Sequence, residues 1–147
     1  MPNAILQPVV ILLAWTMVMW LWMYITRIPA MQKANIDVAS LKGGTGKDLD
    51  AVLPADVQWI AHNYNHLLAE PTVFYAVCIV LAIIGHGDGA NLAIAWLYVA
   101  LRIAHSLVQA TVNRVAIRFL LFAASSLCLI VLIFHAAIPI FDLHLHG

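Results

Sequence analysis

Residues 5–25 read ILQPVVILLAWTMVMWLWMYI, an unbroken apolar stretch without a charged side chain. A helix needs about 20 mostly apolar residues to cross the hydrocarbon layer of a membrane, and this stretch has that length. Three more apolar stretches follow, at about 56–84, 90–112 and 114–140. We therefore expect an all-α integral membrane protein, a four-helix bundle in which residues 1–147 form a single domain.

The composition of the whole chain also predicts a membrane protein. Of its 147 residues 64% are hydrophobic and 10% are charged, against about 45–50% and 25% in an average soluble domain. Seven Lys and Arg balance seven Asp and Glu, which leaves no basic excess to neutralise phosphates and excludes nucleic acid as an expected partner. Cys78 and Cys128 each lie in an apolar stretch without paired spacing, so we expect them to be packing residues.

The basic residues predict the orientation of the spans. The long connection expected from Thr26 to Ala55 carries four of the seven basic residues, and Arg114 follows the third span on the same side. The turn at residues 85–89 has no Lys or Arg. By the positive-inside rule, the first and third connections are then cytoplasmic, and both termini lie on the outer side of the membrane.

Two polar motifs outside the spans invite a functional interpretation. Residues 42–47, KGGTGK, resemble a phosphate-binding loop, but Leu41 stands where that motif needs glycine and Asp48 where it needs Ser or Thr. We interpret this segment as a loop apex. The histidines of the C-terminal segment 142–146 are expected to belong to a frayed tail.

Polar side chains inside the spans form two rows. Asn63, His66 and Glu70 are spaced i, i+3, i+7, which stacks them on one face of the second span, with His62 and Asn65 beside them. The third span carries a second row of polar residues, which are Arg102, His105, Gln109 and Asn113. The fourth span begins with two arginines, Arg114 and Arg118.

The charges of these rows indicate an anion-binding pocket. Ionisable groups inside a span cost several kcal/mol, so they persist where they face protein or water and have partners. Three arginines and one glutamate leave a surplus of about two positive charges, which suits a ligand with carboxylates. Pro71 directly follows Glu70 and is expected to bend the helix there, re-aiming the carboxylate.

Other interpretations of the same residues stay open. The polar groups could form interhelical hydrogen bonds and one Glu–Arg pair that hold the bundle together. His62, His66 and Glu70 match a helical metal half-site, and His66 with His105 could clamp a haem iron. We expect no metal, because the chain has no second carboxylate-rich helix and the arginines would repel a cation.

Two motifs resemble the MAPEG family, the membrane-associated proteins in eicosanoid and glutathione metabolism, especially its bacterial members. They are RIAHSLVQATVNRVAIRF at 102–119 and NYNHLLAEPTVFYA at 63–76. The resemblance implies a homotrimer in the bacterial inner membrane, with glutathione as cosubstrate at each subunit interface near the cytoplasmic side. It implies that Arg102 and Arg118 are catalytic, because nearby cations hold a thiol as thiolate. The ligand-binding residues that it suggests are Arg27, Asn63, Asn65, His66, Glu70, His105, Gln109, Asn113 and Arg114.

Two positions depart from the family pattern. Gln109 stands where many catalytic relatives carry tyrosine, and an amide cannot perform the acid–base chemistry of a phenol. Leu68 or Ala69 occupies the usual glutamate position, so Glu70 is displaced. We therefore keep two functions: glutathione transfer to lipophilic electrophiles or reduction of peroxides, and a non-catalytic lipid-binding or accessory subunit of a larger membrane complex.

Overall fold

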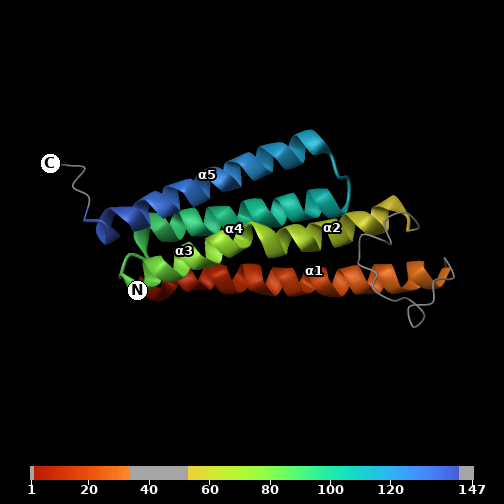
Figure 1. Ribbon diagram of the computed structural model, residues 1–147, viewed down its shortest axis with the longest axis horizontal. Coiled ribbons are helices and arrows are strands. Elements are labelled where there is room, and N and C mark those ends of the chain that lie inside the picture. The colour runs from red at the N-terminus through yellow and green to blue at the C-terminus, as the bar shows by residue number, and fades with distance from the viewer. Residues whose placement is uncertain (1, 34–52, 143–147) are drawn as a thin grey trace.

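The computed structural model describes residues 2–33 and 53–142, and every element in these segments is a helix (Figure 1). Four units are long and apolar enough to cross a membrane: α1, α2 with α3, α4, and α5. This confirms the predicted all-α, four-span architecture. Residues 42–47 and the histidines at 144 and 146 lie outside the described residues. The elements are η1 (Pro2–Ile5), α1 (Leu6–Lys33), α2 (Ala55–Ala69), α3 (Pro71–Ile83), α4 (Gly89–Ala110) and α5 (Val115–Ile140).

The first helix is longer than expected. We predicted a connection from Thr26, but α1 continues to Lys33 through Pro29. Residues 26–33 are rich in good helix formers, and the Thr26 hydroxyl donates to the Trp22 carbonyl oxygen at 3.0 Å, within the helix. At about 1.5 Å per residue, α1 is longer than the roughly 30 Å hydrocarbon layer, so its end extends past that layer.

The second span is broken where Pro71 was expected to bend it. α2 ends at Ala69 and α3 begins at Pro71, which leaves Glu70 at the junction of the two helices. Pro71 has no backbone N–H and its ring would clash with the preceding turn. The Thr72 hydroxyl donates to the Ala69 carbonyl oxygen at 2.7 Å. The junction places Glu70 partway through the span, where its carboxylate faces neighbouring helices.

The two short turns lie where the sequence predicted them. Gly85 and Gly89 have φ values of 79° and 59°, and Asn113 has a φ of 48°, conformations that these residue types adopt most readily. Both termini of the described chain lie at one end of the bundle (Figure 1). That end is fastened by a 2.6 Å contact between His135 Nδ1 on α5 and Asn91 Oδ1 on α4.

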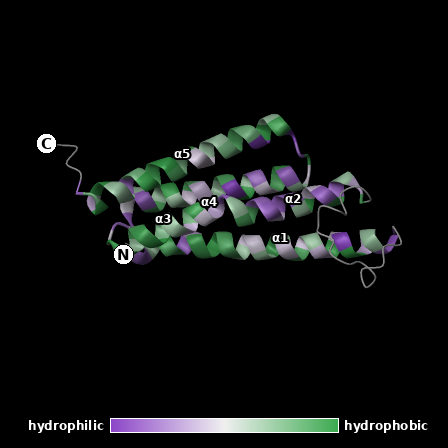
Figure 2. Cartoon of the chain, viewed as in Figure 1, coloured by the Kyte–Doolittle hydropathy of each residue, from purple (hydrophilic) through white to green (hydrophobic). Residues whose placement is uncertain are grey.

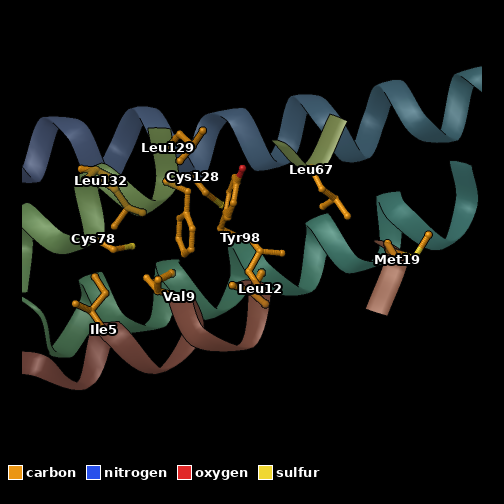
Figure 3. Close-up of a cluster of buried hydrophobic side chains, with 14 of the residues drawn as sticks. Ile5, Val9, Leu12, Met19, Leu67, Cys78, Tyr98, Cys128, Leu129 and Leu132 are labelled. Atoms are coloured by element: carbon orange, nitrogen blue, oxygen red, sulfur yellow. The ribbon is translucent and has the colours of Figure 1, made fainter. Parts of the chain in front are cut away.

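Part of the buried apolar cluster lies toward the terminal end of the bundle. Figure 3 shows Ile5, Val9, Cys78 and Leu132 gathered between α1, α3, α4 and α5. Cys78 and Cys128 are free and buried in this cluster, as predicted. Toward its N-terminal end α5 leans away from α4 (Figure 1). The divergence leaves room for a cavity in the half of the bundle farther from the termini.

Candidate functional site

A cavity of about 340 Å³ lies between α2, α4 and α5. This volume is within the range of small-molecule sites in proteins. The hydrophilic positions of α2 and α4 gather in the half of the bundle farther from the termini (Figure 2). The lining combines polar side chains from all three helices with apolar side chains from α2 and α5. The lining residues are His66, Ala69, Glu70, Arg102, His105, Val115, Arg118, Phe119 and Phe122.

The two arginines of the cavity reach it from different helices. Arg102 on α4 is 1% exposed and is the largest fully buried side chain. Within residues 2–33 and 53–142, neither the Nε of Arg102 nor that of Arg118 on α5 has a hydrogen-bond partner. A buried donor atom without a partner is disfavoured. Arg118 is half-buried, so what lacks a partner at the cavity is the Nε atom of each arginine, which an anion, or water, would complete.

Glu70 is the carboxylate of this cavity, and it is bound by a phenol. The Tyr98 hydroxyl on α4 donates to Glu70 Oε1 at 3.3 Å. Among the described residues, Glu70 forms no ion pair with Arg102 or Arg118. Two arginines against one carboxylate leave a surplus of one positive charge in the cavity lining. This is lower than the surplus of about two expected from sequence, because Arg114 is exposed at the N-cap of α5, outside the lining.

Two histidines also line the cavity. The rings of His66 and His105 have centroids 6.4 Å apart and are tilted by 44°. His66 Nδ1 lies 3.1 Å from Gln109 Oε1. Nδ1 of the buried His105 has no hydrogen-bond partner in the described part of the chain. Across the two described segments, no three His, Cys, Asp or Glu side chains are grouped so that they could hold a metal ion.

Part of the predicted polar row joins helices together. Asn63 Nδ2 on α2 donates to the Ser106 hydroxyl oxygen on α4 at 2.5 Å. Trp15 Nε1 on α1 donates to the same oxygen at 2.9 Å. Asn63 and Gln109 are buried and do not line the cavity. These two hydrogen bonds join helices, which is the alternative role that the sequence left open for the polar groups inside the spans.

Three other predicted ligand-binding residues also lie outside the cavity lining. Asn65 is exposed on α2, Asn113 occupies the turn before α5, and Arg27 is half-buried in α1. Arg102, Arg118, Glu70, His66 and His105 are brought together as the sequence indicated.

Sequence reasoning missed the apolar part of the cavity lining and the partner of Glu70. The apolar part consists of Ala69, Val115, Phe119 and Phe122, which in sequence are indistinguishable from lipid-facing residues. Tyr98 precedes Arg102 by one helical turn. That spacing could have placed the phenol on the face of the polar row.

Comparison with known proteins gives one match. The family model described as MAPEG family matches residues 5–138, which is most of the chain. No curated protein and no solved structure matches this chain. The matched range includes every residue that lines the cavity.

Proposed function

The chain belongs to the MAPEG family, and on that premise we propose that it binds glutathione, or a similar thiol, in the cavity between α2, α4 and α5. Members of this family are glutathione-related transferases and peroxidases or accessory proteins. The observation that carries the proposal is the buried Arg102 guanidinium, whose Nε has no partner within the described residues.

The charges of the cavity suit this ligand. Glutathione has two carboxylates and one ammonium group, so its net charge with a neutral thiol is opposite to the surplus of one positive charge in the lining. Arg102 and Arg118 would bind its anionic groups, because a guanidinium can donate two parallel hydrogen bonds to a carboxylate. Glu70 would receive the ammonium group, and His105 would donate or accept a hydrogen bond beside it.

The same arginines would activate the thiol. Nearby cations lower the pKa of a thiol and raise the fraction of thiolate at neutral pH. In the transferase reaction the thiolate attacks an electrophilic carbon, a carbon–sulfur bond forms, and the electron pair of the broken bond leaves with the departing group or opens a ring. With a peroxide, the thiolate attacks one oxygen and the O–O bond breaks, which gives a sulfenic acid and an alkoxide that takes up a proton and leaves as an alcohol. A second thiol molecule then converts the sulfenic acid to a disulfide and water.

The apolar part of the lining supports a lipophilic second substrate. Phe119 is 67% exposed and Phe122 is 42% exposed, and both line the cavity. In a membrane, exposed side chains of a span border lipid where no neighbouring copy covers them. A lipophilic electrophile could therefore reach the thiolate from the bilayer, without passing through water.

The assembly and location that we propose follow from the same features. The cavity lies in the half of the bundle away from the termini, toward the end where α1 finishes at Lys33 and α5 begins after Arg114. By the positive-inside rule, those cations favour a cytoplasmic position for this end, and the membrane that we propose is the inner membrane of a bacterium. We propose a homotrimer in which a neighbouring copy covers part of the exposed side of each cavity and leaves Phe119 and Phe122 open to the bilayer.

The experiment that tests the proposal is a titration of glutathione into the detergent-purified protein, followed by ultraviolet absorbance of the thiolate. We expect a saturable thiolate signal. Arg102→Ala should abolish it, and Arg118→Ala should weaken binding and raise the thiol pKa. Lys33→Ala, which removes an exposed cation at the end of α1, is the matched control and should change neither. No thiolate signal at millimolar glutathione would contradict the proposal.

A second function, a non-catalytic lipid-binding or accessory subunit, is favoured by Gln109. Its amide stands at the family's tyrosine position and lies against His66, outside the cavity lining. This function predicts a fatty acid, lipid or quinone in the cavity and co-purification with a larger membrane complex. Native mass spectrometry in mild detergent distinguishes the two, because a lone, lipid-free trimer that binds glutathione would exclude the second function.

A further inference from the structure

We propose that Tyr98 is a positioning residue, whose phenol holds the Glu70 carboxylate away from Arg102 and Arg118 so that both guanidinium groups stay available to an anionic ligand. This inference rests on the proposed binding of glutathione in the same cavity. It adds a residue that does not line the cavity and that acts on the ligand only through Glu70.

The position of the phenol is fixed by its surroundings. Tyr98 is fully buried, and its ring stacks on Phe74 with centroids 4.4 Å apart and planes inclined by 20°. Its hydroxyl donates to Glu70 Oε1 at 3.3 Å. Glu70 lies at the junction of α2 and α3, so the phenol holds the carboxylate beside the break in the second span.

An ion pair between Glu70 and one of the two arginines would keep an anionic ligand from binding in the cavity. A carboxylate in a cavity of low dielectric is strongly attracted to a guanidinium, and a bidentate pair would occupy the donors that an anionic ligand needs. A phenol donates one hydrogen bond and adds no charge, so it satisfies the carboxylate without neutralising it. The absence of a Glu70–arginine ion pair among the described residues, in a cavity lined by all three side chains, is the observation that this role explains.

The first test is a double-mutant cycle on glutathione affinity. Tyr98→Phe keeps the ring stacked on Phe74 and removes only the hydroxyl. We expect it to weaken binding about tenfold, because Glu70 then pairs with an arginine. In a Glu70→Gln background the same substitution should change affinity by less than about twofold, because the carboxylate through which Tyr98 acts is gone. Tyr64→Phe on α2, whose hydroxyl joins no helices in the described chain, is the matched control.

The second test needs no ligand. In infrared spectra, the carboxylate band of Glu70 is the one that Glu70→Gln removes. Tyr98→Phe should move this band toward the frequency of a guanidinium-paired carboxylate, and Tyr64→Phe should leave it in place. An unmoved band in Tyr98→Phe, or an equal loss of affinity in both backgrounds, would overturn the positioning role. Failure of the unmodified protein to bind glutathione would instead contradict the proposed function, and the infrared result would still decide the role of Tyr98.

Discussion

Replacement of Arg102 by methionine should make the protein more stable while it removes its ligand. Arg102 is 1% exposed and lies eight residues before the end of α4 at Ala110, about 12 Å from that end at 1.5 Å per residue. Arg102 is therefore at a depth where an arginine costs about 2.5–3.5 kcal/mol. Methionine has a similar length and no charge, so a buried cation whose Nε has no partner within the described residues is replaced by an apolar side chain.

The expected gain is smaller than the full cost because the cavity can admit water. We expect Arg102→Met to raise the free energy of unfolding by about 1–2 kcal/mol, which corresponds to a rise in the unfolding midpoint of about 2–8 °C for a chain of this size. The assay is thermal unfolding in detergent with a thiol-reactive dye. Cys78 and Cys128 are free and buried, so they react with the dye when the protein unfolds.

The control and the ligand arm make this prediction specific. Lys33→Met removes an exposed cation and should change stability by less than about 0.5 kcal/mol. S-methylglutathione, which has the carboxylates but no free thiol to consume the dye, should stabilise the unmodified protein by about 2.7 kcal/mol at a hundred times its Kd, and should not stabilise Arg102→Met. A lower unfolding midpoint in Arg102→Met would refute the reasoning, because it would show that the guanidinium is paired in the folded protein.

Two further predictions concern the packing that supports the site. Ser106→Ala leaves the Asn63 and Trp15 donors without their shared acceptor. Because an interhelical hydrogen bond in a membrane contributes about 0.6 kcal/mol on average and up to about 1.7, the free energy of unfolding in the dye assay should fall by about 1–3 kcal/mol. An unchanged unfolding midpoint would mean that these bonds contribute nothing to stability. Leu132→Ala opens a space in the buried cluster of Figure 3 and should lower the free energy of unfolding by about 2–5 kcal/mol. Glutathione affinity in an equilibrium titration should stay unchanged, because Leu132 does not line the cavity. A matching loss of affinity would show that the cluster and the cavity are coupled.

The spans, their turns and the break at Pro71 could be predicted because each depends on local chemistry. The length of an apolar stretch fixes a span, the glycines at 85 and 89 permit the left-handed conformations that they adopt, and a proline breaks a helix wherever the helix lies. The end of the first helix was not predictable in this way. Residues 26–33 are polar enough for a connection, yet their helix propensity lets α1 continue to Lys33.

The spacing of the polar row could not predict which of its residues contact a neighbouring helix and which line the cavity. Residues at i, i+3 and i+7 share a face, but the rotation and crossing of the helices decide which of them meets a neighbour and which meets a cavity. Asn63 turned out to contact Ser106, whereas Glu70 and His66 reach the cavity. Phe119 and Phe122 line the cavity because α5 diverges from α4 at this end. No local pattern in the sequence predicts that divergence.

The attachment of α5 also gives it the mechanics of a lever. The C-terminal half of α5 is fixed to α4 by the contact between His135 and Asn91 and by the packing of Leu132. The N-terminal half of α5 leans away from α4 (Figure 1). Arg118 lies 17 residues from His135, a lever arm of about 25 Å at 1.5 Å per residue. A tilt of about 5° about that fulcrum carries the Arg118 backbone through about 2 Å. A small tilt of α5 would therefore move the Arg118 guanidinium much farther than it moves the fastened end of the bundle.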